Sequence, residues 1–533
     1  MKIGVSNFKG MIPGIHPRMI PEDHGTIALN ARLDDGSMTP VADGKRVYTF
    51  DSNMASFIRR PGGAWIGFGS VVSAANGNGN QNRVYVTGNG QPKIWISQTE
   101  YVNLRLPAPS LRPSVEIRSG TVDPDTATES LYVFTYLTSL GEESAPSPAS
   151  RAIRYSPGNV IEIGNLPSTN PMPERLLTAM RIYRSVTDTL GETRLYFLKQ
   201  IGFVGSTTDD TDSATLAEEI PSTDYDMPPE DMQGIINLPN GMMAAFSGQE
   251  LMFCEPNIHH AWPQKYRLKV DSDIVGLAAF GSSVAILTTK TPYVAQGTHP
   301  DSMAMERIEM DLPCIAARGI VDMGYSVIYP SHEGLVQIQN GGASLVSAQM
   351  FKRAFWDTLQ PESFVAARHR GRYVFSYLPK RGPYDGDDPY RRLGIMDTSG
   401  AQPFYLEEDS EFHHLYHDIR SGDLFGLHRQ RGIVRWDDLD QRPKRAKWRS
   451  KPIYLPTPTN FGAIRVDVDE GQNADVVCRV FAGDKLVRET RARNVVDRLP
   501  SGFLSDVWSI EIESNCPVTA IYLANLISEL AVG

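Results

Sequence analysis

Short segments of alternating apolar and polar residues recur along this chain, and they constrain its fold more than any other feature. Each forms a unit of two strands separated by a two-to-four-residue turn, as in Val275–Phe280, Gly281-Ser282 and Val284–Thr288. The units begin near residues 241, 275, 326, 372 and 413, so their spacings are 34, 51, 46 and 41 residues. Such spacings are typical of the blades of a β-propeller. Earlier candidate strands at Arg46–Phe50, Ala64–Phe68, Arg83–Thr87 and Lys93–Ser97 favour one or two further blades.

We therefore predict an all-β protein built on a propeller of six or seven blades. Residues 1–112 supply an N-terminal segment and the first blades, and residues 233–441 supply the rest. Between them, residues 113–232 are predicted to form an inserted fibronectin-like β-sandwich, in which Tyr132, Phe134 and Tyr136 share one face of a strand. Residues 442–533 are predicted to form a C-terminal β domain. The only helix indicated by 3.6-residue periodicity is Ser347–Leu359.

Composition supports a globular chain with many turns. Apolar residues make up 41% of its 533 residues, which is enough for several hydrophobic cores, and its 45 Gly and 37 Pro are not gathered in a low-complexity tract. We find no apolar run near the ~20 residues that span a bilayer and no signal peptide, so we expect synthesis in a cytoplasm without membrane insertion. Four cysteines without a C-x-x-C pair are expected to be buried, not disulfide-bonded.

The net charge of −10 comes from one stretch of the sequence. Residues 200–264 contain eleven carboxylates and no Lys or Arg, whereas the remainder has 52 basic and 51 acidic residues. We predict that this acidic stretch faces a lumen or a partner. Its candidate residues are Asp209, Asp210, Asp212, Glu218, Glu219, Asp224, Asp226, Glu230 and Asp231.

Several smaller clusters have two interpretations each. Asp209 to Asp212 could hold calcium but fit a solvated acidic loop better, because the glycine and terminal glutamate of an EF-hand are missing. His413, His414 and His417 lie in a predicted strand, where His413 and His417 would be ~13 Å apart, so exposed polar positions are favoured over a metal site. The pair His259-His260 is interpreted in the same way.

The basic segment Arg442–Lys451 could bind nucleic acid through its six cations and Trp448. We favour a linker or interface whose cations meet the acidic stretch of this or a neighbouring subunit.

Enzymatic chemistry is not indicated. The chain has no G-x-x-x-x-G-K-[ST], H-E-x-x-H or G-x-S-x-G motif, and no sialidase-type Ser-x-Asp box. Paired carboxylates of the glycosidase kind arise by chance among 62 acidic residues. We predict no enzyme, no catalytic residues, no cofactor and no metal.

Four stretches resemble the tail nozzle proteins (tail tube, tubular B-type) of short-tailed bacteriophages. The resemblance is diffuse and touches most of the chain without a catalytic signature. The stretches are Phe8–Pro13 with its continuation to Gly36, Thr135–Thr138 with Gly141–Pro146, Leu238–Gly241 through Cys254–Glu255-Pro256 and His260–Pro263 to Tyr266, and Arg498–Phe503 with Trp508–Ile512.

This resemblance implies a structural virion protein of the phage tail that forms a ring of about six copies. The ring would lie below the portal and adaptor proteins, near tail fibre or needle proteins, and conduct the genome during ejection. DNA would pass without specific binding, since an acidic wall repels the phosphate backbone. The alternative function is a carbohydrate-binding or glycan-cleaving propeller that acts in host receptor recognition.

Overall fold

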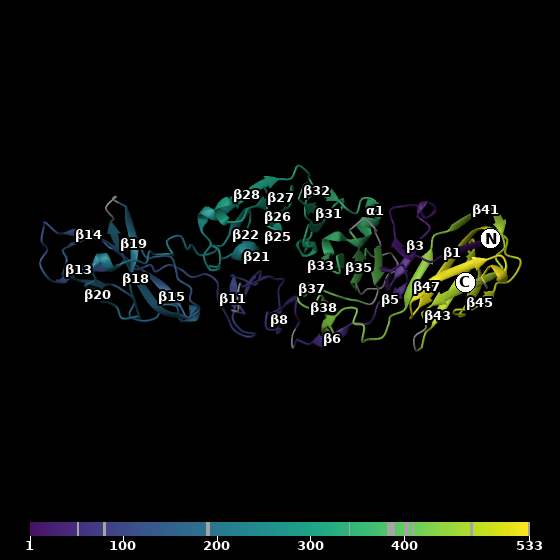
Figure 1. Cartoon of the computed structure of the whole chain (residues 1–533), viewed down its shortest axis with the longest axis horizontal. Coiled ribbons are helices and arrows are strands. Elements are labelled where there is room, and N and C mark those ends of the chain that lie inside the picture. The colour runs from purple at the N-terminus through teal and green to yellow at the C-terminus, as the bar shows by residue number, and fades with distance from the viewer. Residues whose placement is uncertain are drawn as a thin grey trace.

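The computed structural model is elongated, with a β-propeller between two other β domains (Figure 1). It describes residues 1–50, 53–77, 82–187, 192–340, 342–380, 390–398, 404–407, 410–469 and 473–530. The inserted domain lies at one end of the long axis, and both chain termini lie in the domain at the other end (Figure 1). The prediction of an all-β fold with a propeller, an inserted sandwich and a C-terminal β domain is confirmed.

The propeller consists of small antiparallel sheets that follow one another along the chain. Their first strands, β9, β21, β25, β29, β33 and β37, contact one another in that order and form the inner wall. The sheets are β9–β12 (Ser73–Asn76, Val84–Thr87, Lys93–Trp95, Tyr101–Asn103), β21–β24 (Gln233–Asn237, Met243–Ser247, Glu250–Phe253, Arg267–Lys269), β25–β28 (Ile274–Phe280, Ser283–Thr288, Tyr293–Gln296, Ala304–Arg307), β29–β32 (Val321–Asp322, Val327–Ser331, Gly334–Gln339, Gly342–Leu345), β33–β36 (Val365–His369, Arg372–Tyr377, Arg392–Met396, Phe404–Glu407) and β37–β39 (Leu415–His417, Leu424–His428, Gly432–Arg435).

The ring closes through the N-terminal part of the chain. Strand β6 (Lys45–Tyr48) pairs with β39 and completes the sheet of β37–β39. The two-stranded sheet of β7 (Ser56–Arg59) and β8 (Trp65–Phe68) follows, with Phe57 5.8 Å from Tyr416 of β37 and Ile58 in one hydrophobic cluster with Val84 of β10. The blade number, six or seven, depends on whether this pair counts as a blade and stays a prediction.

The inserted domain is a sandwich because its strands bury alternate residues between two sheets. Tyr132 and Phe134 of one sheet share a core with Ile161 and Ile163 of the other. One sheet is β15–β18–β19 (Tyr132–Thr138, Leu177–Thr187, Thr193–Ile201), the other is β13–β17–β20 (Ser114–Ser119, Val160–Gly164, Thr207–Asp209), and β14 (Thr128–Ser130) pairs with β16 (Ile153–Tyr155).

The C-terminal domain shares a sheet with the propeller. Eleven described strands form this sheet, which begins with β33–β36 and continues through β2 (Lys9–Met11) and β3 (His24–Leu29) into the C-terminal strands. Those strands are β40 (Ala446–Ser450), β41 (Ile453–Thr459), β43 (Val476–Ala482), β44 (Lys485–Thr490) and β46 (Ser505–Ser514). A second sheet, β1–β47–β42–β45 (Lys2–Val5, Val518–Ala524, Ala463–Val468, Val496–Arg498), also begins with an N-terminal strand, and β4 (Ala31–Arg32) pairs with β5 (Thr39–Pro40).

The predicted helix Ser347–Leu359 is wrong over its first half. Strand-like backbone at Lys352 separates residues 347–351 from α1 (Arg353–Trp356), which continues into η8 (Asp357–Leu359). The Met350 carbonyl accepts a hydrogen bond from the Gly14 amide and is therefore drawn out of a helical pattern. Other helical residues form single 3-10 turns: Pro17–Met19, Pro173–Arg175, Ser213–Thr215, Pro239–Gly241, Gln264–Tyr266, Pro300–Ser302, Ala317–Gly319, Pro361–Ser363 and Ile527–Glu529.

Cysteine burial agrees with the sequence prediction. Cys254, Cys314, Cys478 and Cys516 are all buried free thiols. Burial raises the pKa of the first three to about 12, so they stay protonated near neutral pH. Across the described residues, we find no helix with the length and apolar character needed to cross a bilayer.

Candidate functional site

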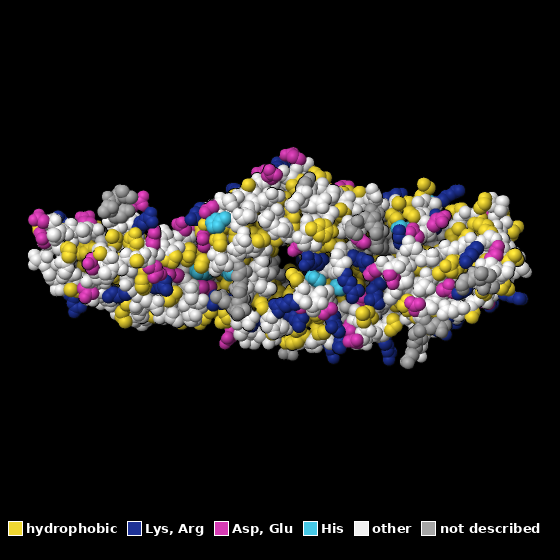
Figure 2. Space-filling model, in the orientation of Figure 1, with side chains coloured by type: hydrophobic (Ala, Val, Ile, Leu, Met, Phe, Trp, Pro, Cys, Tyr) yellow, Lys and Arg dark blue, Asp and Glu magenta, His cyan; other side chains and the backbone are white. Residues whose placement is uncertain are grey.

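A cationic pocket with a volume of about 670 Å³ opens on the propeller. Its lining comes from residues 49–50 and 53–55 between β6 and β7, Gly69 after β8, the 3-10 turn before β29, the residues just before β35 and β37, and the β38–β39 hairpin. The charged or titratable lining residues are Arg318, Arg391, His413, His428 and Arg429. Figure 2 shows Lys, Arg and His side chains gathered beside a hollow in the middle of the molecule, in the region of β37 and β38.

Two of these arginines are held by neutral oxygen atoms. Arg391 is 8% exposed; its Nε donates to Ser376 Oγ (2.9 Å), and its Nη2 donates to the carbonyls of Ser376 (2.8 Å) and Ser363. Arg318 Nη2 donates to the His413 carbonyl. No carboxylate of the described residues forms an ion pair with Arg318, Arg391 or the exposed Arg429, so this positive charge is not neutralised within the described chain.

Burial without an acidic partner alters the protonation equilibria of the pocket. It lowers the pKa of Arg318 to about 10. Burial together with the Arg318 charge lowers the pKa of Arg391 to about 10, although the Glu411 charge acts in the opposite direction. Both guanidiniums remain charged at neutral pH. Burial also lowers the pKa of His413, with a further contribution from Arg429, although Glu411 Oε1 lies 3.4 Å from His413 Nε2. Each shift indicates that additional positive charge is unfavourable here.

His428 offers a hydrogen-bond donor to this pocket. Its Nδ1 accepts the backbone amides of Gln430 (3.1 Å) and Arg431 (3.3 Å). This hydrogen-bond pattern assigns the proton of the neutral ring to Nε2, which can then donate. Burial lowers the pKa of His428, which favours this neutral form. The pocket thus combines guanidinium groups with an N–H donor.

The acidic stretch is not a uniform exposed surface. The Asp209 side chain is 0% exposed; its Oδ2 lies 2.6 Å from Arg184 Nη1 and accepts a 2.8 Å hydrogen bond from the Tyr132 hydroxyl. The prediction that Asp209 faces a lumen or a partner is therefore wrong, and so is a solvated loop at this residue. A buried arginine inside the sandwich supplies the positive charge that this carboxylate requires.

The other acidic candidates lie at the surface or close to it, and lysines or arginines from outside the stretch pair with several of them. Whether any of them faces a lumen or a partner stays a prediction. Glu218 lies 3.8 Å from Arg181, Glu219 3.1 Å from Arg194, Asp224 2.8 Å from Lys265 and Glu230 2.5 Å from Arg105, while Asp212 caps the turn Ser213–Thr215, Asp226 accepts from the Gln264 amide, Asp231 accepts from Ser247 Oγ and Asp210 is exposed.

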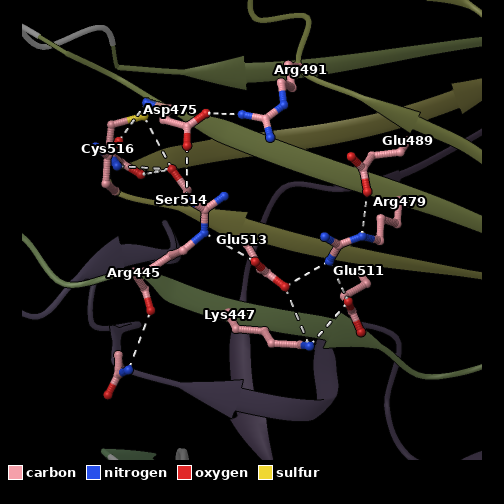
Figure 3. A network of polar contacts seen from close by, with 12 residues as sticks. Arg445, Lys447, Asp475, Arg479, Glu489, Arg491, Glu511, Glu513, Ser514 and Cys516 are labelled. Atoms are coloured by element: carbon pink, nitrogen blue, oxygen red, sulfur yellow. Dashed lines mark hydrogen bonds and ion pairs between the residues drawn. The ribbon is translucent and has the colours of Figure 1, made fainter. Parts of the chain in front are cut away.

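The basic segment Arg442–Lys451 contributes strand β40 to the shared sheet. Figure 3 shows its cations within a polar network of the C-terminal domain. Arg445 contacts Asp475 (2.9 Å) and Glu513 (3.1 Å), and Lys447 contacts Glu511 (3.2 Å). The prediction that these cations meet the acidic stretch of residues 200–264 is wrong for Arg445 and Lys447, because the neighbouring strands carry their partners.

Trp448 of the same segment is fully buried and donates its Nε1 proton to the Lys9 carbonyl. It is therefore not placed to stack on a nucleic-acid base.

The histidine clusters are more buried than expected. His413, His414 and His417 are half-buried, and burial together with the Arg318 charge lowers the pKa of His414 to about 3. His259 and His260 are 7% and 5% exposed. The prediction of exposed polar positions is therefore wrong for both clusters. The part of the chain that the structure describes contains no group of three or more potential metal ligands.

Sequence reasoning missed the cationic pocket because its arginines are far apart in the chain. Arg318, Arg391 and Arg429 lie in three different connecting segments, and each is an ordinary surface-type residue in its local sequence. Among the titratable lining residues named above, only His413 belongs to a local sequence pattern, the histidine cluster. Closure of the propeller brings these groups together.

Comparisons with known proteins leave the family open. No protein-family model matches the chain, and neither does any curated protein. One solved structure with a partial likeness is PorZ, an essential bacterial surface component of the type-IX secretion system of Porphyromonas gingivalis. The two are 12% identical with a TM-score of 0.22, and the likeness covers 66% of this chain and 41% of PorZ. A likeness this weak carries no functional argument.

Proposed function

We propose that this chain is a structural component of a short phage tail, in which several copies form the nozzle ring and conduct the genome. The ring contains about six copies of the chain. Its other partners are the portal and adaptor proteins and nearby fibre or needle proteins. The proposal rests on the sequence resemblance, and the structure supports it by where the resembling residues lie.

Residues of the resembling stretches lie at the junctions between domains. At one junction, His260 Nε2 lies 2.7 Å from the Glu143 carbonyl, which joins the propeller to the inserted sandwich. At the other, Phe8 packs edge-on against Trp448 with ring centroids 5.0 Å apart. Residues that hold domains in a fixed arrangement are those a structural assembly protein requires.

The shared sheet supports the same proposal. Strands β2 and β3 connect propeller strand β36 with β40 through backbone hydrogen bonds. The pairing with β36 involves one residue pair from each of β2 and β3, and one hydrophobic core contains residues of both the propeller and the C-terminal domain. The two are therefore expected to behave as one rigid body. Rigidity of this kind suits a subunit that must keep a channel open.

Electron microscopy and light scattering of the purified protein test this proposal. We expect rings with a central channel, either alone or after addition of a portal–adaptor complex. The variant His260→Ala should weaken ring formation by loosening the sandwich, whereas His332→Ala, at an exposed position, should not. A strictly monomeric mass at high concentration, without binding to portal–adaptor complexes, would contradict the proposal.

The alternative, a carbohydrate-binding propeller, is favoured by one observation, the pocket at Arg318, Arg391 and Arg429. Its charge suits an acidic sugar better than a neutral one. Glycan-array binding confined to acidic glycans would support this second function, and no binding to any glycan would exclude it.

A further inference from the structure

Three arginines line the open volume of the cationic pocket. Arg318, Arg391 and Arg429 together provide three formal charges, and none forms an ion pair with a described carboxylate. A buried charge without a partner is costly, and proteins normally compensate it with an opposite charge. Among the described carboxylates, the charge of Glu411 acts on Arg391 without an ion pair, but burial and the Arg318 charge outweigh it, so a bound anion would complete the compensation.

Unused hydrogen-bond donors point to the same conclusion. Arg391 is 92% buried, since its exposed fraction is 8%, and its described hydrogen bonds use only Nε and Nη2. Its Nη1 has no hydrogen-bond partner among the described residues. Arg318 Nε is buried and has no partner either. A guanidinium with N–H groups that have no partner can still donate them to the oxygen atoms of a phosphate or carboxylate.

The size and the walls of the pocket limit the kind of ligand. A volume of about 670 Å³ lies within the ~300–1,000 Å³ of small-molecule sites and exceeds what a free inorganic anion needs. Phe50, Met54 and Leu427 add apolar surface beside the cations. Such surface can contact the uncharged body of a ligand while the guanidiniums bind its anionic group.

We propose that this pocket binds a sugar-sized molecule that carries an oxyanion, either a phosphate or a carboxylate. Arg318 and Arg391 form the buried part of the site, and Arg429 on the β38–β39 hairpin binds from the exposed rim. His428 can donate a further hydrogen bond from Nε2. This binding activity is independent of ring formation, because it requires only the pocket of one subunit.

Calorimetric titration of the full chain tests the site. The probes are glucose 6-phosphate for the phosphate source, glucuronate for the carboxylate source and glucose as the neutral reference. We expect at least one charged probe to bind at least tenfold more tightly than glucose, with affinity that falls as salt is added. Preference for one charged probe identifies the source of the oxyanion.

Two variants on one hairpin provide the residue-level test. Arg429→Gln removes the rim cation at an exposed position and should weaken binding of the charged probe about tenfold, as loss of a charge-assisted hydrogen bond predicts. Arg431→Gln removes an equally exposed cation that does not line this pocket, and should change affinity less than about twofold. Thermal unfolding of both variants checks that the hairpin remains folded.

Three results would overturn the proposal. One is absence of binding both to DNA and to the two charged probes at concentrations up to about 10 mM. Another is equal weakening by Arg429→Gln and Arg431→Gln, which would indicate a diffuse electrostatic effect. The third is binding of single-stranded or duplex DNA but of neither charged sugar, which would assign the cations to a nucleic-acid backbone. Ring assembly, measured separately, is unaffected by each of these outcomes.

Discussion

Two buried arginines, one in the inserted sandwich and one in the propeller, differ in what compensates their charge. Arg184 is 1% exposed and lies 2.6 Å from the Asp209 carboxylate. Arg391 is 8% exposed, and its described contacts are hydroxyl and carbonyl oxygens of Ser376 and Ser363. Burial lowers the pKa of Arg184, but the Asp209 charge together with Tyr155, Tyr132 and the hydrogen bond to Asp209 outweighs it, and the net shift is upward. For Arg391, burial prevails and lowers the pKa to about 10.

The difference separates a structural charge from one that is available for binding. The Arg184–Asp209 pair is complete within the sandwich, where the Tyr132 hydroxyl also donates to the carboxylate. Arg391 has hydrogen bonds to neutral oxygens and no ion pair with a described carboxylate, and the charge of Glu411 does not outweigh the effect of burial on its pKa. Burial alone therefore does not identify a functional arginine. Arg60 is equally buried with carbonyl partners, and Arg391 differs from it because Arg391 also lines an open pocket beside two further arginines.

The largest expected effect is that of Asp209→Asn, which would convert the first arginine into a copy of the second. Asparagine keeps the shape and can still accept from Tyr132, but it leaves Arg184 buried without compensation. We expect a loss of about 3–5 kcal/mol in the free energy of unfolding of the sandwich. Calorimetry, with hydrogen exchange of β15 and β18, measures it.

Asp212→Asn is the matched control for that substitution. Asp212 is exposed and caps a 3-10 turn, and asparagine is an equally good cap, so stability should hardly change. Equal effects of the two substitutions would show that Arg184 does not depend on Asp209.

A smaller loss is expected for Arg391→Met. The substitution removes hydrogen bonds to the Ser376 and Ser363 oxygens but leaves no carboxylate unpaired. The loss in the free energy of unfolding should therefore stay below about 2 kcal/mol. For Arg429→Met, at the exposed rim of the pocket, we expect almost no loss. Chemical denaturation of the full chain compares them. If Arg391→Met cost more than Asp209→Asn, Arg391 would be a structural charge and the comparison would fail.

Local sequence was sufficient to predict the hairpins. The predicted strands Val275–Phe280 and Val284–Thr288 correspond to β25 and β26, because two short apolar runs separated by the turn Gly281-Ser282 can be read directly from the sequence. The pairing of β3 with β40 places Gly25 opposite Ser450, and no local pattern encodes contacts so distant in the chain. The helix prediction failed for the same reason, since a distant amide binds Met350.

The candidate site was less predictable than the fold. A count of carboxylates suggested that Asp209 was exposed, because the count does not include Arg184 on a different strand. Arg391 and Arg318 could not be recognised from the sequence, because the absence of an ion pair depends on which residues surround each arginine in the folded chain. Sequence indicates which residues can carry charge, but only the packing shows which charges are paired.

His369 extends the comparison to a buried basic group that can lose its proton and become neutral. It is 8% exposed, packs edge-on against Trp436, and has no hydrogen bond at either ring nitrogen within the described residues. Burial, followed by the charges of Arg370, His417 and Arg372, lowers its pKa from 6.5 to about 3. Unlike Arg391, it therefore remains neutral in the folded protein.

This shift predicts lower stability in acid. Below pH 6.5 the unfolded chain binds a proton at His369 that the folded protein does not, so stability falls by about 1.4 kcal/mol per pH unit down to about pH 3. Thermal unfolding at pH 7.5 and pH 5.5 measures the slope. His369→Phe keeps an aromatic ring beside Trp436 and should reduce the slope by about this amount. Identical slopes for the two proteins would contradict the assignment.

The smallest effect is expected in the surface network of the C-terminal domain, which is the exposed counterpart of the Arg184–Asp209 pair. Arg479 contacts Glu489 at 2.9 Å, Glu511 at 3.0 Å and Glu513 at 2.8 Å, and Glu489 is 44% exposed (Figure 3). Glu489→Gln leaves Arg479 with two carboxylates and access to water, so the loss should be below about 1 kcal/mol. Denaturation in low and high salt measures it.

Salt separates the two kinds of ion pair. Counter-ions screen the exposed Arg479–Glu489 contact, so the small effect of Glu489→Gln should disappear near 1 M salt, where the Debye length is about 3 Å. The Arg184–Asp209 pair excludes solvent, and the effect of Asp209→Asn should persist at the same salt concentration. If salt abolished both effects, burial would not distinguish these ion pairs. The missing ion pair of Arg391 would then be no reason to regard its charge as available for binding.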